Sequence, residues 1–524
     1  MGNLLSAPVT EKETHQGVTK DEQLKFGLSS MQGWRVHMED AHIAEGDLYA
    51  LDASGNGTST KISLPGHALF AVYDGHGGTF AAIYSGNNFL RILSKQTKFV
   101  RYAKMCHEDT EASGDGQAST ATPSKTKASR AAKKMELLEQ ALKQAFVETD
   151  YEIGLAIRGK SHADANSPYH DPPKDAASSD GATGSTGDSN DNHTSGNDHH
   201  GPTMEGAAMK AASDHVSAIN DDGNSGTTSC VVMITPESIV CANAGDSRAV
   251  FARRPLESTG AGSGSGVGKA IPLSFDHKPD DEEEERRVRC AGGYVAGGRV
   301  EGDLAVSRGL GDFRFKQMAV VLNNTQLYPE ESDETAAGGS KPAGDTMDTT
   351  DDEGDGNDQT SNNGGRRVPL PFSPGDQKVS PIPDVIVHAR NAERDEYVVV
   401  ACDGIWDVVS NQQCIAELDQ IMYDEGEREL GLVAEEILDT CLQYGSKDNM
   451  TVIVVQLPGC EKSYTDVAAK AKSDSTSSVE GDEEPPQPQR EGVVGRRRKR
   501  EERQQRQRED DDDEGGESPL AAPL

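Results

Sequence analysis

Four aspartates of this chain lie directly beside apolar runs, where carboxylates from distant segments could gather and bind metal ions. Three follow such a run and one precedes it: Asp74 after residues 68–73, Asp246 after 239–245, Asp403 after 397–402 and Asp448 before 451–455. Apolar runs of this length predict buried β-strands. Carboxylates that converge at the ends of several strands cannot all stay ionised unless cations lie between them. Because hard divalent metals prefer oxygen ligands, the pattern predicts a metal-dependent enzyme.

An arginine near two further acids points to a phosphate substrate. The segment Q-G-W-R-V-H-M-E-D at residues 32–40 places Arg35 close to Glu39 and Asp40. A guanidinium is the group best shaped for forked contact with phosphate oxygens. Taken alone, the segment is equally explained by a surface salt bridge.

A glycine-rich segment supplies a candidate acid catalyst beside the first aspartate. In Y-D-G-H-G-G at residues 73–78, the glycines let the backbone turn sharply and approach an ion closely. Asp74 could then bind an ion through its carboxylate and Gly75 through its carbonyl oxygen. His76 has a pKa suited to general acid catalysis near neutral pH. A tight turn capped by the aspartate is the competing interpretation of this segment alone.

These residues must be positioned by a protein that is richer in strands than in helices. Consecutive strands are predicted at residues 228–234, 239–244 and 248–252. Helices are predicted at residues 133–151, 281–291 and 430–442. Runs of consecutive strands favour antiparallel sheets covered by a few helices, so the predicted fold class is α+β.

Low-complexity segments interrupt a single compact domain, which is predicted at residues 23–458. Residues 1–22 are expected to form a flexible arm, and residues 459–524 a disordered charged tail. Four insertions without periodicity are also expected to be disordered: about 108–130, 160–223, 256–268 and 327–378. The tail carries a basic cluster at residues 496–500, which is either a nuclear localisation signal or part of a solvated tail.

The charge balance and the cysteines bear on the class of protein. The 524 residues carry 52 basic and 88 acidic side chains, a formal net charge of -36, which argues against general nucleic-acid binding. The eight cysteines include no C-x-x-C pair. Half of them fall in apolar or periodic segments and are expected to be reduced, buried thiols of an intracellular protein: Cys230, Cys241, Cys402 and Cys441. We expect a monomer.

The first residues fit the acceptor pattern for N-myristoylation. The sequence M-G-N-L-L-S at residues 1–6 would place the acyl chain on Gly2. One myristoyl chain binds membranes weakly and reversibly. We therefore expect a division between cytoplasm and peripheral membrane, with the nucleus as an alternative if the basic cluster acts as a signal.

Taken together, these segments resemble the metal-dependent serine/threonine protein phosphatases of type 2C. The matching stretches are Q-G-W-R-V-H-M-E-D-A-H (32–42), F-A-V-Y-D-G-H-G-G (70–78), S-G-T-T-S-C-V-V (225–232), A-N-A-G-D-S-R-A (242–249), D-H-K-P (276–279), G-R-V-E-G-D-L-A-V-S-R-G-L-G-D (298–312), V-V-V-A-C-D-G-I-W-D (398–407) and G-S-K-D-N-M-T-V (445–452). The resemblance covers the ordered parts of residues 23–458. It implies a four-layer α-β-β-α sandwich of two antiparallel sheets flanked by helices.

The resemblance also implies a centre of two Mg²⁺ or Mn²⁺ ions, with a candidate third. The implied ligands are Asp74, which bridges the two ions, the carbonyl of Gly75, the carboxylates of Asp403 and Asp448, and the weaker or water-mediated Glu39 and Asp40. Asp246 and Asp407 match positions of the third, looser site. Arg35 matches a phosphate-binding arginine, His76 a general acid and Asn449 a residue that orients a ligand.

The implied chemistry is attack of a metal-activated water on phosphoserine or phosphothreonine in proteins, without a covalent intermediate. Two alternatives are kept: a catalytically silent scaffold that binds phosphoproteins, and a structural Ca²⁺-binding module. A silent scaffold usually lacks a metal ligand or the arginine, and this chain keeps them all. At residues 316–380 a long acidic insertion replaces the segment that forms the family's flap beside the site, which leaves substrate selection open.

Overall fold

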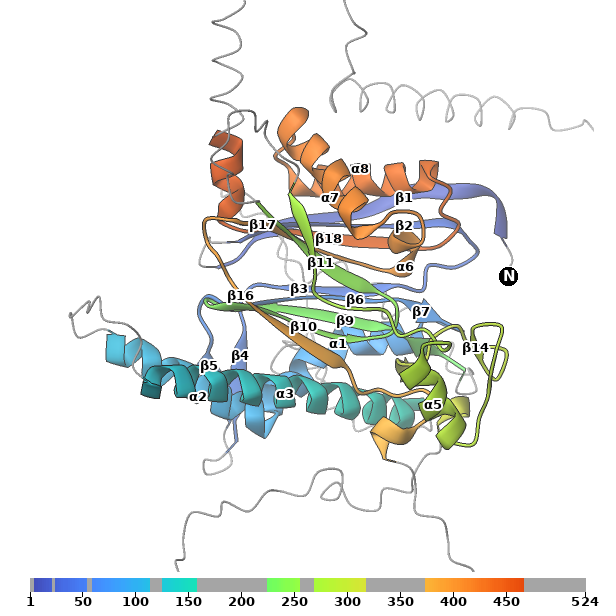
Figure 1. The fold of residues 1–524 in the computed structure, drawn as a ribbon, viewed down its shortest axis with the longest axis horizontal. Coiled ribbons are helices and arrows are strands. Elements are labelled where there is room, and N and C mark those ends of the chain that lie inside the picture. The colour runs from blue at the N-terminus through green and yellow to red at the C-terminus, as the bar shows by residue number, and fades with distance from the viewer. Residues whose placement is uncertain are drawn as a thin grey trace, which may run out of the picture.

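Two antiparallel sheets pack face to face, with helices on both outer surfaces (Figure 1). The computed structural model of the chain describes residues 4–20, 24–53, 59–113, 125–157, 224–254, 268–316 and 373–465. Apolar clusters fill the space between the sheets and the space under each helical layer. This arrangement confirms the predicted α+β sandwich.

The first sheet has six strands in the order β1-β2-β18-β17-β11-β12. Their bounds are β1 Leu4–Val18, β2 Lys25–Arg35, β18 Met450–Gln456, β17 Asp395–Ala401, β11 Arg248–Arg253 and β12 Lys269–Pro272. The central strands β17 and β18 are buried along their whole length. Burial on both faces explains why these two strands contain the continuous apolar stretches 397–401 and 452–455.

The second sheet has five strands in the order β16-β10-β9-β6-β3. Their bounds are β16 Asp384–Ala389, β10 Ser238–Ala244, β9 Ser229–Ile234, β6 Ala68–Tyr73 and β3 Ala41–Glu45. Short pairings complete the strands: β4 (Tyr49–Asp52) with β5 (Thr60–Ser63), β13 (Val295–Ala296) with β14 (Arg299–Val300), and β8 (Gly226–Thr227) between β7 (Gly75–His76) and β15 (Leu310–Gly311).

Helices cover the outer face of each sheet. The first sheet carries α7 (Asn411–Asp419), followed by the π-helical turn η5 (Gln420–Asp424), and α8 (Leu430–Gln443). The second carries α1 (Phe80–Lys95), α2 (Thr97–Ser113) and α3 (Lys125–Ile157). Helix α8 lies so close to β2 that a Cβ atom on Gly27 would come within 2.1 Å of the carbonyl carbon of Leu430. The helices predicted at 133–151 and 430–442 are therefore confirmed, and α3 extends beyond its prediction at both ends.

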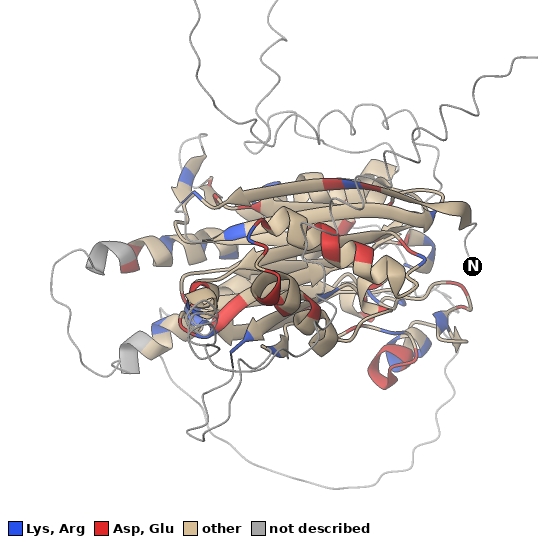
Figure 2. Cartoon of the chain, turned by 90° about the horizontal axis from the view of Figure 1, so that it is seen from above, with Lys and Arg blue, Asp and Glu red and all other residues tan. Residues whose placement is uncertain are grey.

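The core cysteines are free thiols, as expected. Cys230, Cys241, Cys402 and Cys441 are buried and unbridged. Among the described residues, no helix combines the length and the apolar character needed to cross a bilayer. In the view of Figure 2, Lys and Arg are interspersed with Asp and Glu.

The expectation of a flexible N-terminal arm is wrong for residues 4–18. These residues form β1, an edge strand that pairs antiparallel with β2 from Leu4 opposite Arg35 to Val18 opposite Lys25. Lys12 reaches the neighbouring helix α8, where its Nζ lies 2.6 Å from Oδ1 of Asp439. Edge strands tolerate charged residues because backbone pairing does not require apolar side chains. The polar composition of this segment therefore concealed a strand.

Two other predicted boundaries also need correction. Helix α2 ends at Ser113 and α3 begins at Lys125, so both helices enter the insertion predicted at 108–130. The domain does not end at 458, because Cys460 and Tyr464 are buried in the core beneath α7 and α8. Most of the predicted insertions and of the tail lies outside the described residues: 114–124, 158–223, 255–267, 317–372 and 466–524.

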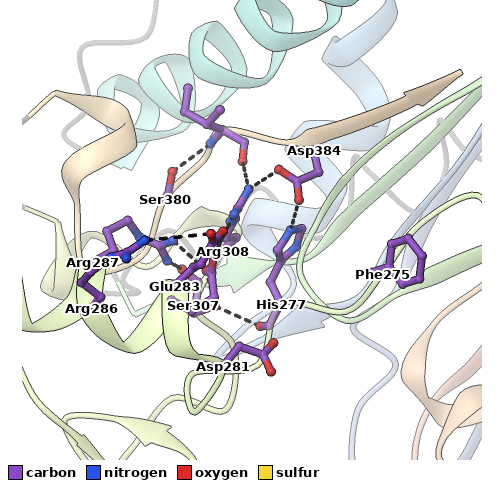
Figure 3. A network of polar contacts seen from close by, with 12 residues as sticks. Phe275, His277, Asp281, Glu283, Arg286, Arg287, Ser307, Arg308, Ser380 and Asp384 are labelled. Carbon is purple, nitrogen blue, oxygen red and sulfur yellow. Dashed lines mark hydrogen bonds and ion pairs between the residues drawn. The ribbon is translucent and has the colours of Figure 1, made fainter.

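A small subdomain packs beside the edge strand β16. It contains α5 (Glu282–Cys290), β13, β14 and the turns η2 (Phe313–Phe315) and η4 (Pro374–Asp376), built around a separate apolar cluster. Helix α5 confirms the helix predicted at 281–291. Figure 3 shows Arg308 and His277 pointing toward the carboxylate of Asp384, which begins β16. These ion pairs, in which His277 and Arg308 are largely buried and Asp384 is 64 % exposed, thus attach the subdomain to the second sheet.

Glu284 is the centre of this network. Its Oε1 lies 2.7 Å from Nη2 of Arg308, and its Oε2 lies 2.7 Å from Nη1 of Arg287. Oε2 also accepts a hydrogen bond of 2.6 Å from Oγ of Ser307. Burial disfavours the ionised carboxylate, but these partners outweigh burial and lower the pKa of Glu284 from 4.5 to about 2.

This lowered pKa predicts an acid-dependent loss of stability. An acid whose pKa is lower in the folded state stabilises the fold above its unfolded-state pKa, and this stabilisation is lost as pH falls toward the folded-state pKa. We expect the Glu284 contribution to fall by about 2 kcal/mol between pH 7 and pH 3. Glu284→Gln should be less stable at pH 7 and should lose less stability on acidification, as measured by urea unfolding. The control is Glu285→Gln, whose more exposed carboxylate pairs with Arg289. Parallel pH profiles for wild type and Glu284→Gln would contradict this expectation.

Candidate active site

The sequence-predicted aspartates gather because the strand registers bring their loops to one end of the two sheets. Pairing of Ala41 with Tyr73 aligns Asp40, before β3, with Asp74, after β6. Pairing of Ala401 with Arg248 and with Val452 brings in the remaining loops. These loops carry Asp403 at the start of α6 (Asp403–Trp406), Asp246 before β11 and Asp448 before β18. In Figure 1, β7 and α6 lie at the same end of the sheets. We call Asp40, Asp74, Asp246, Asp403 and Asp448 the acid cluster.

Burial, reinforced by mutual repulsion, raises the pKa of the acids in the acid cluster. Burial, followed by the charge of Asp403, raises the pKa of Asp74 well above its ordinary value. Burial and the charges of Asp246 and Asp448 do the same to the pKa of Asp403. Burial raises the pKa of Asp40 to about 7. Without added cations, the cluster therefore holds more negative charge than its surroundings can stabilise.

The acid cluster fits hard divalent cations. Oδ2 of Asp40 accepts a hydrogen bond of 2.6 Å from Oγ1 of Thr451, but its Oδ1 is buried without a partner among the described residues. Ligand atoms of Asp40, Asp74 and Cys402 all lie within 4.8 Å of one another. The Cys402 thiol is engaged by the backbone, because its Sγ accepts from the amide of Thr451 at 3.1 Å. A dense set of carboxylate oxygens with an unpaired buried atom suits Mg²⁺ or Mn²⁺.

Asn449 fixes the segment that carries Glu39. Its Oδ1 accepts a hydrogen bond of 3.0 Å from the amide of Glu39, and its Nδ2 donates to the carbonyl oxygens of Gln32 and His37 at 2.8 and 2.9 Å. Its own amide donates to Oδ1 of Asp448 at 2.8 Å. Asn449 therefore contacts the segment of Glu39 through its side chain and Asp448 through its backbone amide.

Glu39 and Gly75 are held close together by the glycine-rich segment. Oε1 of Glu39 accepts a hydrogen bond of 3.1 Å from the amide of Gly78. A Cβ atom on Gly75 would lie only 2.2 Å from the carbonyl oxygen of Glu39, so the backbones approach as only a glycine allows. The predicted backbone turn is present, with positive φ at Gly77 and Gly78, while the predicted approach to an ion stays a prediction.

The structure pairs Arg35 with Asp448, not with the acids that follow it in the sequence. Its Nη2 contacts Oδ2 of Asp448. The Arg35 side chain is 42 % exposed, so the guanidinium can also reach a ligand from solvent. An exposed arginine beside the acid cluster is suited to holding phosphate oxygens.

His76 has a partner that the sequence did not indicate. Its Nε2 lies 2.9 and 3.0 Å from Oδ1 and Oδ2 of Asp312, whose side chain is 1 % exposed. Burial opposes the charged imidazole, but the charge and hydrogen bond of Asp312 outweigh it and raise the pKa of His76. Asp312 is the last residue of the segment G-R-V-E-G-D-L-A-V-S-R-G-L-G-D. Its φ of 53° lies in the left-handed region, which residues other than glycine seldom adopt.

The candidate third site contains a second unexpected residue. The Nζ atom of Lys278 contacts Oδ2 of Asp246, which is buried between β10 and β11. Asp407, predicted as its companion, is exposed at the end of α6. Burial raises the pKa of Asp407, while the charge of Lys278 lowers it. The sequence signal was the segment D-H-K-P, whose lysine was not assigned a role.

Comparisons with known proteins agree on one family. The family model described as protein phosphatase 2C matches residues 24–133 and 187–450. A protein phosphatase 2C homolog 2 of Aspergillus flavus is 30 % identical over 463 residues, which cover 87 % of this chain and 68 % of the relative. A protein phosphatase 2C homolog 2 of Saccharomyces cerevisiae is 28 % identical over 463 residues, covering 87 % and 63 %.

A solved structure of a serine-threonine phosphatase 2C from Toxoplasma gondii also matches, at 16 % sequence identity and a TM-score of 0.45, covering 85 % of this chain and 99 % of the other. The family assignment rests on the sequence matches, which span the segments that build the acid cluster. The chain therefore belongs to the protein phosphatase 2C family, the metal-dependent serine/threonine protein phosphatases.

Proposed function

We propose that the acid cluster holds the divalent ions with which this protein phosphatase hydrolyses phosphoserine and phosphothreonine in proteins. The observation that carries this proposal is the close approach of buried carboxylates whose pKa values are raised, next to an exposed arginine and a histidine paired with Asp312. Asp74, Asp403 and Asp448 would be the principal ligands. Asp40, Glu39 and the carbonyl of Gly75 would support them. We propose two Mg²⁺ or Mn²⁺ ions, with a third, looser ion at Asp246 and Asp407.

The bound ions would supply an activated water and neutralise charge on the phosphoryl group. Arg35 would leave Asp448 and take up phosphate oxygens through its forked N–H groups. His76, held by Asp312, would donate its proton to the departing serine or threonine oxygen. Asn449 would keep Asp448 and Glu39 in place. No side chain of the site is required to form a covalent bond to phosphorus.

The test is metal-dependent turnover of a phosphothreonine peptide by the full chain. We expect phosphate release with Mn²⁺ or Mg²⁺, none after chelation, and no labelled protein when a ³²P-labelled peptide is used in a single turnover. A silent scaffold would bind the peptide without releasing phosphate. A structural Ca²⁺ module would gain thermal stability from metal without turnover. Either result would refute the proposed activity.

We also propose that Gly2 is myristoylated and that the protein divides between cytosol and peripheral membrane. The support is the M-G-N-L-L-S sequence; Gly2 itself lies outside the described residues. The basic cluster at 496–500 would add a nuclear fraction, and we propose a monomer. Gly2→Ala should move the protein from the membrane pellet to the supernatant on fractionation. An unchanged distribution would eliminate the anchor.

A further inference from the structure

A lysine ammonium contacts the carboxylate that the third ion would need. Nζ of Lys278 contacts Oδ2 of Asp246, whose side chain is 4 % exposed, whereas that of Lys278 is 38 % exposed. We propose that Lys278 is a tethered cation that occupies the third-ion position and must move away before a divalent ion can bind Asp246. This inference rests on the proposed function, because it concerns an ion of the same site.

The charges around the ammonium support a cation position. Asp246, Asp403 and Asp276 all act electrostatically on Lys278, and Lys278 in turn acts on Asp407. Asp276 already has a partner, because its two oxygens accept from Arg248 at 2.8 and 2.7 Å. The ammonium of Lys278 therefore pairs with Asp246, the most buried of the acids near it.

The backbone that carries Lys278 is fixed against the loop of Asp246. The amide of His277 donates to the carbonyl oxygen of Gly245 at 3.0 Å, and its Nε2 lies 3.2 Å from Oδ2 of Asp384. The amide of Lys278 donates to Oδ2 of Asp281 at 3.1 Å. These hydrogen bonds of the main chain, together with the contact of His277 with Asp384 seen in Figure 3, hold the backbone of Lys278 beside the loop of Asp246, so only the lysine side chain has to move.

An ammonium and a divalent ion cannot share Asp246 without repelling each other at short range. The stem of lysine has four rotatable carbons and the side chain is partly exposed, so the ammonium can swing into solvent without opening the subdomain. Each third-ion binding event then includes the loss of this ion pair. The apparent affinity of the third ion is lowered accordingly, and the lysine keeps Asp246 neutralised when the ion is absent.

The experiment is a Mn²⁺ titration of the full chain by isothermal calorimetry, with free Mn²⁺ followed by electron paramagnetic resonance. Lys278→Met keeps the length of the stem and removes the charge. We expect its weakest Mn²⁺ site to bind at least about tenfold more tightly than in wild type, since one unit charge at contact distance is removed. Lys278→Arg should stay close to wild type. The matched control, Lys378→Met, removes a lysine paired with Glu301 in the same subdomain and should leave the weak site unchanged.

Two results would overturn the inference: an unchanged or weaker third site in both Lys278→Met and Lys278→Gln, or a gain that persists in the double variant Lys278→Met, Asp246→Asn. Both lysine variants retain the buried His277 and Glu284 contacts that hold the backbone. If the proposed function itself were wrong, the titration would give another result: wild type would show no tight Mn²⁺ binding, and Asp403→Asn would leave the Mn²⁺ titration curve unchanged.

Discussion

Asp74→Asn is expected to remove at least about three orders of magnitude from kcat/KM on a phosphothreonine peptide while making the metal-free protein more stable. The loss is expected because Asp74, as a proposed metal ligand, would help to hold the ions that contribute several kcal/mol to transition-state charge stabilisation. The gain follows because burial and the charges of neighbouring acids, Asp403 foremost, raise the pKa of Asp74, and asparagine replaces that carboxylate at nearly constant volume. We expect a rise of about 2 °C in the Tm of the chelated protein.

A lower kcat/KM together with a higher Tm of the metal-free protein indicates a functional residue, because replacing a merely structural residue would lower both. Wild type should gain stability on addition of Mn²⁺, and Asp74→Asn should gain much less. The control is Asp303→Asn, in which an exposed acid paired with Arg314 is neutralised far from the acid cluster in the sequence. If Asp74→Asn kept Mn²⁺-dependent turnover and the full Mn²⁺ shift in Tm, the assignment of Asp74 as a ligand would be wrong.

Asp312→Asn is expected to reduce turnover of phosphothreonine by about 10²-fold or more and to spare p-nitrophenyl phosphate. A positioned general acid contributes about 10²–10⁴-fold when the leaving group needs a proton. The threonine alkoxide needs that proton, whereas p-nitrophenolate is a stabilised anion that leaves without it. Asparagine tolerates the left-handed backbone of position 312 and can still contact Nε2 of His76, but it no longer stabilises the imidazolium.

The comparison variant is His76→Asn, which should show the same dependence on the leaving group. A double variant should then be no worse than His76→Asn alone, because the two residues act as one unit. Equal losses of kcat on both substrates in Asp312→Asn would instead assign Asp312 a structural role. Asp312 faces Gly226 closely, where an added Cβ would lie 2.2 Å from Oδ2, so circular dichroism and Tm of the variant must accompany the kinetics.

Four aspartates of the acid cluster could be predicted from sequence because each adjoins a strand that is buried on both sides, whereas Asp40 precedes the half-buried β3. β6, β10, β17 and β18 are buried along their whole length and rich in apolar residues, so their ends are visible in the sequence. Helix α8 could also be predicted, because the apolar residues on its buried face recur at helical spacing. Local sequence patterns therefore show which faces of a strand or helix are buried.

Polar partnerships between distant segments could not be predicted in this way. Asp312 is 236 positions from His76, and Lys278 is 32 positions from Asp246. Neither pairing leaves a periodic signal, because each depends on the tertiary positions of two loops. β1 was missed for a related reason: its stability comes from backbone pairing with β2 and from polar contacts such as Lys12 with Asp439.

Because Leu4 pairs with Arg35, the first described residue of β1 lies at the end of the β1–β2 pair that carries the proposed phosphate-binding arginine. The first described residue lies opposite the arginine proposed to bind phosphate, and paired residues on adjacent strands are separated by about 5 Å. Purification tags fused to the N-terminus would therefore enter the chain close to Arg35 and would compete with large substrates for access to it. The acyl chain that we propose on Gly2 would likewise hold Arg35 near the lipid surface, so the height of a phosphorylated residue above that surface would influence which substrates are reached.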